Sequence, residues 1–386
     1  MAATIYLIIL LKERLYIMSK LITVNVNKKP AYDIMLEKDF SMLKGKLVEL
    51  EYTGKRCCIV CDSNTKNLYL AKLKKAIEGV FDTVVDYTFE AGEERKNTDT
   101  VYSIIETLVN NSFDRHDILI ALGGGVVGDI TGYAAAIYMR GIDFVQVPTT
   151  LLACVDSSIG GKTGVDFKSY KNLVGAFKMP SLVYIAIDTL LSLSDRQYYN
   201  GMGEVMKYGL IMDASLYEWI IEKMYDIHDK KYETLEEMVG YCIDCKKRIV
   251  ERDPFEKGDR MLLNFGHTIG HAIEREKNFE FLHGECIALG MVAAAYMSLK
   301  KEKISSDEFY EIRDMFVPFN LPITIDNIDP QKILETLKHD KKSNGKIVKF
   351  ILLKKVGKAY IDETVTDEEI LAAIREIHFT EEDMKA

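Results

Sequence analysis

Three histidines and one glutamate have the residue types and spacing of a catalytic metal site. His267 and His271 are four residues apart, so a helix would place both imidazoles on one face. His283 lies at the predicted start of the next helix, and Glu204 lies in the glycine-rich segment 201–209. Three or four nitrogen and oxygen donors with one open position suit a catalytic zinc or a similar ion. The spacing alone does not decide whether His271 is a ligand.

The alternative is that these histidines are structural, as an isolated pair usually is. Three of the seven histidines fall within residues 267–283, each close to a glycine, which favours a metal. Lys207 follows Glu204 by three residues and is expected beside it on a helix. The other four histidines have charged neighbours and are predicted to be structural: His116, His228, His339 and His378.

A turn of three glycines, Gly123–Gly125, follows a predicted buried strand and precedes a helix of small residues that ends near Tyr138. Backbone N–H groups at such a turn can approach a phosphate closely, and the start of a helix favours negative charge. The sequence runs G-G-G-x-x-G-D as far as Asp129, so it does not match the dinucleotide fingerprint G-x-G-x-x-G. The turn predicts phosphate binding, with relief of crowding as the alternative.

The segment 148–165 combines hydroxyl groups, glycines, Asp156 and Lys162 with little amphipathic pattern, and Lys171 and Asn172 follow it. Glycine and serine destabilise a surface helix, so this is not the composition of one. Because the flanking residues are apolar, we expect the segment to be buried and to line a site. A flexible loop with incidental polarity is the alternative.

The elements that must hold these residues fall into two halves. Before residue 190, predicted strands alternate with helices, which is typical of a parallel, doubly wound α/β sheet. Beyond it, helical periodicity dominates and only one hairpin is predicted. We therefore expect a Rossmann-like α/β domain at 18–190 and a mainly α-helical domain at 191–386. The predicted strands are 56–61, 83–89, 117–122, 144–147, 182–187, 346–353 and 358–361, and the predicted helices are 68–80, 99–110, 217–225, 234–250, 267–276, 286–300 and 307–315.

The composition limits the classes of function. The 386 residues are 48% hydrophobic, as in a globular protein with two domains. A net charge of −9 argues against a nucleic-acid-binding face, so an anionic ligand must be held by a local cluster of Lys and Arg. Seven cysteines without framework spacing, including a lone C-x-x-C at Cys242 and Cys245, indicate buried thiols in a reducing cytoplasm.

The chain shows no signal for a membrane. The apolar stretch near the N-terminus is too short to cross a bilayer and lacks the features of a signal peptide. Residues 1–17 are predicted to be an upstream extension, because the second methionine, Met18, opens a more usual start.

Taken in order, these motifs resemble those of the 3-dehydroquinate synthase family of the shikimate pathway, from about Met18 to the end of the chain. The motifs are very specific jointly, although several are weak singly. They are Gly123–Asp129, Tyr138–Gly141, Pro148–Gly164, Lys171–Gly175, Gly201–Gly209, Leu263–Glu274, His283–Glu285 and Asp340–Lys342.

The resemblance implies that zinc, or cobalt as an alternative metal, is held by Glu204, His267 and His283. It also implies a homodimer in which Arg140 reaches into the active site of the other subunit. The catalytic residues that it implies are Lys162, Lys207, Lys246, Arg260, Asn264 and His271, and the other substrate contacts are Lys171, Asn172, and Lys341 or Lys342. The implied NAD contacts are Asp62, Asn64, Glu93, Lys96, Gly124, Gly125, Asp129, Thr149, Thr150, Asp156, Lys162, Lys171, Thr189, Ser192 and Leu193.

The reaction implied by the resemblance converts 3-deoxy-D-arabino-heptulosonate 7-phosphate to 3-dehydroquinate and phosphate, the second step of that pathway. A hydride moves from the substrate to NAD, phosphate is eliminated beside the new ketone, the hydride returns, and an intramolecular aldol step closes the carbocycle. Zinc bound to the substrate hydroxyls lowers their pKa. Because this substrate carries a carboxylate and a phosphate, an acidic protein needs local basic side chains to bind it.

Three alternatives are weighed. A sibling cyclase that makes 2-deoxy-scyllo-inosose or a valiolone would alter the anion-binding positions, and Lys246, Arg260 and Asn264 are kept here. A polyol dehydrogenase of the glycerol dehydrogenase type would release NADH on turnover. A non-catalytic descendant would have lost metal ligands or lysines, and this chain has lost none.

Three positions depart from the family pattern. Gly203 stands in place of the usual alanine, Ser194 where proline is frequent, and Gln197 where glutamate is common. None removes a group that the reaction needs, so we expect changes in local rigidity or NAD affinity only.

Overall fold

The computed structural model describes residues 21–168, 170–278, 280–344 and 348–379, and between 339 and 344 it describes the backbone alone. The predicted extension at 1–17 lies outside the described residues. The chain divides into two compact units. Unit 1 comprises the residues up to Thr149 together with Ser157–Thr189, and unit 2 comprises Thr150–Asp156 together with the residues from Leu190 onward.

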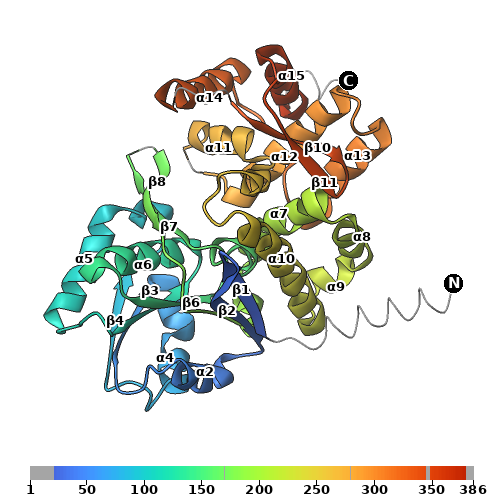
Figure 1. Ribbon diagram of the computed structural model, residues 1–386. Helices are drawn as coiled ribbons and strands as arrows, with labels where there is room; N and C mark the ends of the chain where they lie inside the picture. Colours follow the sequence, from blue (N-terminus) through green and yellow to red (C-terminus); the bar gives the residue numbers. More distant parts are fainter. Residues whose placement is uncertain (1–20, 169, 279, 345–347, 380–386) are drawn as a thin grey trace, which may run out of the picture. The chain divides into compact units, whose positions relative to one another are not determined.

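Unit 1 is built on a seven-stranded sheet with the strand order β1-β2-β9-β6-β5-β3-β4 (Figure 1). All neighbouring strands are parallel except β1 and β2, which form an antiparallel edge. The predicted parallel α/β sheet is therefore confirmed, with one antiparallel edge strand added to it. The strands are β1 (Leu21–Val26), β2 (Lys29–Glu37), β3 (Arg56–Asp62), β4 (Thr83–Phe89), β5 (Ile118–Gly123), β6 (Asp143–Pro148) and β9 (Leu182–Ala186).

Both faces of this sheet are covered, because alternate side chains of a strand point to opposite sides. Cys57, Ile59 and Cys61 of β3 join one core with α2 (Leu43–Glu49) and α4 (Ala71–Ala76). Cys58 and Val60 join the other core with α5 (Thr98–Asn110) and α6 (Gly125–Ile137). All seven cysteines are buried free thiols, as the sequence predicted.

The second half of the segment 148–165 was not predicted as a strand, yet it begins a hairpin. Strand β7 (Lys162–Phe167) pairs antiparallel with β8 (Tyr170–Phe177), and Gly164 lies opposite Gly175. A Cβ on Gly164 would lie 2.7 Å from the carbonyl oxygen of Val174, so glycine permits the close approach of the two backbones. The same glycines hid the strand, because glycine weakens the strand signal in a sequence.

Unit 2 is mainly helical, as predicted, and it contains one antiparallel hairpin (Figure 1). The predicted helix at 267–276 is confirmed residue for residue, and the one predicted at 286–300 begins earlier, at His283. No helix in the described part of the chain is long and apolar enough to cross a membrane. The elements are α7 (Asp195–Met212), α8 (Ala214–Glu222), α9 (Met224–His228), α10 (Tyr232–Arg252), α11 (His267–Glu276), α12 (His283–Lys300), α13 (Ser306–Asp314), α14 (Pro330–Asn344), β10 (Phe350–Lys355), β11 (Lys358–Asp362) and α15 (Asp367–Ile377).

Glycines let α7, α11 and α12 pack with their backbones in contact. A Cβ on Gly290 of α12 would lie 1.9 Å from the carbonyl oxygen of Gly266, at the start of α11. A Cβ on Gly284 would lie 1.9 Å from the carbonyl oxygen of Asn200 in α7. Separations below 3 Å leave no room for a side chain, so these positions set how closely the three helices approach. The helices that carry Glu204 and the three histidines are thereby held together.

Candidate functional site

The predicted metal ligands meet where α7, α11 and α12 pack together in unit 2. Oε1 of Glu204 lies 3.4 Å from Nε2 of His267 and 3.5 Å from Nε2 of His283. The Glu204 side chain is fully buried, with Oε1 facing the two imidazoles and Oε2 paired with Lys207. His271 lies one turn along α11 and is exposed, and its ring centroid is 5.2 Å from that of His267. A buried carboxylate facing two imidazoles is a donor set that a metal ion would satisfy.

In each half-buried imidazole that faces Glu204, the second ring nitrogen is already engaged. Nδ1 of His267 lies 3.0 Å from the carbonyl oxygen of Phe265, which can only accept, so Nδ1 donates. Nδ1 of His283 lies 3.5 Å from Oε1 of Glu274, a carboxylate that is almost completely buried. Such contacts fix the tautomer of a ligating histidine and leave Nε2 for the metal. In both histidines the remaining Nε2 faces Glu204.

The geometry is compatible with two ligand sets. Nitrogen atoms of His267, His271 and His283 all lie within 4.8 Å of one another. Glu204 contacts His267 and His283, which agrees with the set implied by the family resemblance. Zinc accepts three such protein donors and keeps a fourth position for substrate or water. The residues present therefore fit a catalytic zinc or a similar ion.

A buried ion pair adjoins this group, as the spacing of the two residues predicted. Lys207 contacts Oε2 of Glu204 one turn away on α7, and its side chain is 1% exposed. Burial would raise the pKa of Glu204, but the charge of Lys207 and the two imidazoles outweigh it and hold that pKa well below its ordinary value. Burial and the charge of Lys207 lower the pKa of His267, which favours the neutral imidazole that binds a metal.

His283 is affected in the opposite direction. Burial would lower its pKa, but Glu204 and Glu274 outweigh burial and raise the pKa to about 9. At neutral pH this imidazole therefore carries a proton that a metal ion must displace before it can bind. The pKa values of the two histidines thus shift in opposite directions, because Lys207 acts on His267 whereas Glu274 contacts His283.

Asp156 ties the predicted catalytic lysines of unit 2 together. Its carboxylate lies 3.0 Å from Nζ of Lys246 on α10 and 3.9 Å from Nζ of Lys207. It also accepts a hydrogen bond of 2.6 Å from the hydroxyl of Tyr208. Burial lowers the pKa of Lys246 to about 8, and Asp156 offsets this only in part. Lys246 therefore loses its proton more readily than an ordinary lysine.

Arg260 and Asn264 lie in a turn of one short helix, Asp259–Asn264, just before α11. The Arg260 side chain is almost wholly buried and donates to the carbonyl oxygen of Pro254 at 2.6 Å. The carboxylate of Asp253 accepts from the backbone N–H of Arg260 and from two further N–H groups of the same loop. Asp253 thus holds the loop that carries Arg260. Burial would raise the pKa of Asp253, but these hydrogen bonds outweigh burial and lower that pKa.

The polar residues predicted for unit 1 form a separate cluster. Nζ of Lys96 lies 2.7 Å from Asp129 of α6 and donates to Oδ1 of Asn172 at 2.6 Å. Nζ of Lys171 lies 3.2 Å from Oε1 of Glu93. Burial would lower the pKa of Lys96, but Asp129 and Glu93 outweigh burial and raise it. These five side chains come from three separate segments of sequence, 93–96, α6 and β8, so the fold brings the predicted set together.

The glycine turn lies between β5 and α6, as predicted. Crowding explains part of its composition, because a Cβ on Gly123 would lie 2.5 Å from Cγ2 of Val127 and one on Gly128 would lie 2.6 Å from Oε1 of Gln146. Gly125 has more room, since its nearest neighbour would be Oγ of Ser157 at 3.0 Å. The first N–H groups of α6 have no partner within the helix, which leaves them available to an anion.

The remaining predicted residues are less closely grouped. Asp62 caps the turn after β3 through Thr65, at 2.7 Å, and Asn64 is exposed on that turn. Arg140 is exposed in a left-handed conformation after α6, with φ of 68°. The side chains of Lys341 and Lys342, on α14, lie outside the described residues. In unit 1, Thr149 and Thr189 are buried and Lys162 is exposed. In unit 2, Ser192 is exposed, whereas Thr150 and Leu193 are half-buried.

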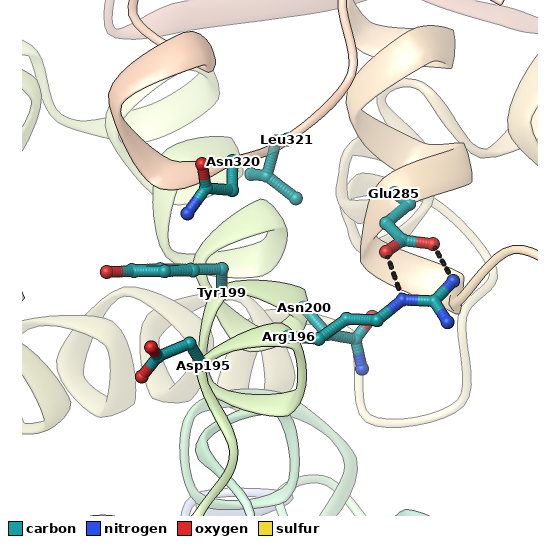
Figure 2. Close-up of a pocket in the computed structure, with 7 residues that line it drawn as sticks. All are labelled: Asp195, Arg196, Tyr199, Asn200, Glu285, Asn320 and Leu321. Carbon is teal, nitrogen blue, oxygen red and sulfur yellow. Dashed lines mark hydrogen bonds and ion pairs between the residues drawn. The ribbon is translucent and has the colours of Figure 1, made fainter.

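Sequence reasoning assigned no role to several residues that complete this site. Glu274 follows His267 and His271 at helical spacing, which could have indicated a partner for an imidazole. Tyr208 directly follows Lys207, but nothing in the sequence connects it to Asp156. A cavity of about 140 Å³ at the first turns of α7 and α12 was also unpredicted (Figure 2). It is lined by Asp195, Arg196, Tyr199, Asn200, Glu285, Asn320 and Leu321.

The departures at Ser194 and Gly203 have local explanations. Oγ of Ser194 accepts from the N–H of Gln197 at 3.4 Å and caps α7. A Cβ on Gly203 would lie 2.9 Å from the carbonyl oxygen of Gly284, so glycine here accompanies a close approach of α7 and α12. The side chain of Gln197 is exposed.

Two family models and curated relatives match most of the chain. The models of the 3-dehydroquinate synthase N-terminal and C-terminal domains match residues 86–200 and 201–343. A 3-dehydroquinate synthase of Acetivibrio thermocellus is 41% identical over 355 residues, which cover 92% of this chain and 98% of the relative.

Similar solved structures include two related cyclases. A 2-epi-5-epi-valiolone synthase of Streptomyces hygroscopicus subsp. jinggangensis 5008, with NAD⁺ and Zn²⁺ bound, has a TM-score of 0.83 at 25% identity, covering 92% of this chain and 98% of that one. A 2-deoxy-scyllo-inosose synthase complexed with carbaglucose-6-phosphate, NAD⁺ and Co²⁺ has a TM-score of 0.79 at 26% identity, covering 92% and 99%.

Proposed function

The chain belongs to the 3-dehydroquinate synthase family, and we propose that it converts 3-deoxy-D-arabino-heptulosonate 7-phosphate to 3-dehydroquinate and phosphate. It would act as a carbon–oxygen lyase that uses NAD catalytically. The observation that carries this proposal is the buried cluster of unit 2, in which Glu204 faces two imidazoles while Lys207 and Lys246 adjoin it through Asp156. A metal donor set beside basic side chains suits a substrate with hydroxyl groups and anionic groups.

We propose that Glu204, His267 and His283 hold zinc, or cobalt in its place, and that His271 contacts the substrate. Two observations support this division. Glu204 is within 3.5 Å of both partner imidazoles, and His271 is the exposed member of the histidine group. When bound, zinc supplies a Lewis acid for a substrate hydroxyl and NAD supplies a hydride acceptor.

NAD binding is assigned mainly to residues of unit 1, beginning with the glycine turn. The free N–H groups at the start of α6 suit a pyrophosphate. Lys96 and Asp129 are already paired, so they offer an ordered polar surface. The proposed NAD contacts are Asp62, Asn64, Glu93, Lys96, Gly124, Gly125, Asp129, Thr149, Thr150, Asp156, Lys162, Lys171, Thr189, Ser192 and Leu193.

The substrate's negative charges would be met by basic and amide side chains. Lys246 carries its proton at neutral pH, because its pKa is about 8, and it can bind an anion in that form. Buried Arg260 keeps its charge at any physiological pH and can bind a carboxylate or phosphate with two hydrogen bonds. The proposed substrate contacts are Lys162, Lys171, Asn172, Lys207, Lys246, Arg260, Asn264, His271, and Lys341 or Lys342.

We propose a cytoplasmic homodimer in which Arg140 enters the partner's active site. The exposed position of Arg140 supports this proposal. Apolar side chains of unit 1 are also exposed, with the adjacent Met139 at 50% and Leu173 of β8 at 60%. Exposed apolar groups of this kind favour a protein–protein contact.

The nearest alternative is a sibling cyclase that acts on a sugar phosphate without a carboxylate. Identity favours the dehydroquinate reaction, since the A. thermocellus synthase is 41% identical while the solved valiolone synthase is 25% identical. Retention of Arg260, Asn264 and Lys246 agrees with a substrate that carries both anions.

The deciding experiment measures phosphate release from the heptulosonate phosphate with NAD and zinc, before and after removal of the metal by a chelator. We expect release that stops on chelation and returns with zinc, without accumulation of NADH. Release of phosphate from glucose 6-phosphate instead would indicate a sibling cyclase. NADH that accumulates with glycerol would indicate a polyol dehydrogenase, and no turnover with any substrate would indicate a binding protein.

A further inference from the structure

Helix α7 presents a row of three polar side chains, one turn apart, to the first turn of α12. Arg196, Asn200 and Glu204 are spaced four residues apart and so share one face of the helix. Glu204 faces His283, Asn200 accepts from the N–H of Gly284, and Arg196 binds Glu285. Three consecutive residues of α12 are thus contacted by three successive turns of α7.

The outermost contact is a two-pronged ion pair at the cavity shown in Figure 2. Nε of Arg196 donates to Oε1 of Glu285 at 2.7 Å, and Nη2 donates to Oε2 at 2.8 Å. The same Oε2 accepts from the N–H of Leu282 at 2.7 Å, so Glu285 also caps α12. Nη2 donates in addition to the carbonyl oxygen of Glu280 at 3.2 Å. Arg196 therefore braces both the cap of α12 and the loop that leads into it.

The middle contact, between Asn200 and Gly284, is buried and brings the two helix backbones close together. Asn200 is 7% exposed, and its Oδ1 accepts from the N–H of Gly284 at 2.6 Å. A Cβ on Gly284 would collide with the backbone of Asn200 at 1.9 Å. His283 directly precedes Gly284, so the contacts that hold Gly284 against Asn200 also restrain the backbone of this candidate ligand.

We propose that Arg196 and Glu285 are positioning residues for the metal: they hold the first turn of α12 against α7 and so set the separation of Glu204 and His283. The inference rests on the proposed metal site. His283 is the first residue of α12, where a helix frays most easily because its N–H groups lack partners within the helix. A catalytic constellation requires its ligands to be held within about 0.5 Å, which a frayed turn would not provide.

A purely structural role would give a different result from a positioning role. Arg196 is 58% exposed although Glu285 is only 12% exposed, and an ion pair with one solvated partner contributes about 1 kcal/mol to folding. The pair should therefore affect stability little. Its effect on the metal should be larger, because residues that orient a ligand typically change metal affinity about 10–100-fold.

The test compares Arg196→Gln, Glu285→Gln, the double variant and Arg196→Lys with the wild-type protein. Zinc affinity is measured by competition with a chelator, and the ligand field is measured from the visible absorption of the cobalt-substituted protein. We expect each Gln variant to bind zinc about 10–100-fold more weakly and to show an altered cobalt spectrum. Arg196→Lys should recover part of the affinity, since one charged hydrogen bond to Glu285 can form.

Lys332→Gln is the matched control. Lys332 is 61% exposed and binds Glu276 at the end of α11 at 2.6 Å, so its loss also removes an exposed ion pair between helices of unit 2. Its zinc affinity and cobalt spectrum should equal those of the wild type. The double variant should bind zinc no more weakly than the single variant with the lower zinc affinity, because Arg196 acts on the metal site through Glu285.

Two outcomes overturn the inference. In the first, Arg196→Gln has the zinc affinity and the cobalt spectrum of the wild type. The ion pair would then have no effect on the metal, whatever the melting temperature of the variant. A wild-type protein that binds neither zinc nor cobalt would overturn the proposed metal site, and the inference with it. The first outcome leaves the proposed function intact, so the two failures are distinguishable.

Discussion

The polar cluster of unit 2 and the polar cluster of unit 1 use charge in different ways. In unit 2, Glu204 and Lys207 are 0% and 1% exposed, and each depends on the other to remain charged. In unit 1, Lys96 and Asp129 are also largely buried, at 7% and 17%, but Lys171 and Glu93 are 22% and 36% exposed, so water shares in stabilising that second pair. Burial strengthens electrostatic interactions but makes an unpaired charge costly.

This contrast agrees with the work proposed for each cluster. The unit 2 residues would act on developing charge, which requires fixed groups from which water is excluded. The unit 1 residues would hold a cofactor through backbone N–H groups and partly exposed side chains. This depends more on a complementary shape than on a strong electrostatic field. Substitutions in unit 2 should therefore change both stability and chemistry, whereas those in unit 1 should change mainly cofactor affinity.

The largest effect is expected for Glu204→Gln. Loss of the carboxylate leaves Lys207 as a buried charge without its nearest partner, which should lower the free energy of unfolding by about 3–5 kcal/mol. Phosphate release should fall by on the order of a thousandfold (about 4 kcal/mol of barrier), because the proposed metal site would lose its only anionic ligand. Urea unfolding and a phosphate assay check this. Normal stability in this variant would remove the contrast between the units.

A smaller effect, which depends on pH, is expected at Lys246. Its pKa of about 8 lies below the ordinary value of 10.5 because the side chain is buried. Between these two values the folded protein has lost a proton that the unfolded chain still binds, so the free energy of unfolding should rise with pH while anion binding weakens. The kcat/KM profile should fall above pH 8.

Lys246→Arg separates charge from titration. Arginine keeps its proton at high pH, so the alkaline fall near pH 8 should disappear even if the maximal rate drops. A profile identical to that of the wild type would show that another group titrates there.

The next effect concerns two glycines in the first turn of α6, Gly125 and Gly128. Gly125→Ala places a Cβ 3.0 Å from Oγ of Ser157, which can rotate away, so stability should change by no more than about 1 kcal/mol. The Kd for NAD, followed by fluorescence titration, should rise about tenfold (about 1.4 kcal/mol), because the added methyl obstructs the backbone N–H groups.

Gly128→Ala is the matched control on the same helix. Its Cβ would lie 2.6 Å from Oε1 of buried Gln146, so the free energy of unfolding should fall by about 1–3 kcal/mol. In the fraction that remains folded, the Kd for NAD should be near that of the wild type. If both variants lost stability and neither lost affinity, the turn would serve packing alone.

The smallest effect is expected for Glu93→Gln in unit 1. The Lys171–Glu93 pair is partly exposed, so its loss should change the free energy of unfolding by less than about 1 kcal/mol. A threefold or smaller change in the Kd for NAD is expected, about 0.7 kcal/mol. A loss as large as that for Glu204→Gln would mean that both clusters rely on buried charge.

Much of the architecture followed from periodicity. The runs at 56–61 and 117–122 are continuously apolar because both faces of the sheet are covered, and each forms a buried strand. The helix at 267–276 was predicted to the residue because its apolar positions repeat at helical spacing. The alternation in Leu21–Val26 was also readable, and it forms the edge strand β1, which was not predicted.

The remainder depended on contacts between segments far apart in sequence. Periodicity predicted that α12 begins at Cys286 and not at His283, because the first turn of this helix is polar and is held by α7 instead of by an apolar face of its own. The role of Glu274 requires knowing that α11 and α12 cross beside His283. Local sequence contains neither fact, and so the ligand set stayed open until a family resemblance was applied.

The short segment Thr150–Asp156 has a consequence for how the chain can be divided. It lies within the first half of the sequence but belongs to unit 2, where Asp156 meets Lys246, Lys207 and Tyr208. A fragment starting at Leu190 would bury two ammonium groups without this carboxylate. During synthesis, moreover, the segment emerges before any of its partners. The boundary at residue 190 therefore marks no autonomous folding unit, and cutting there should give two fragments that regain a native structure only when mixed.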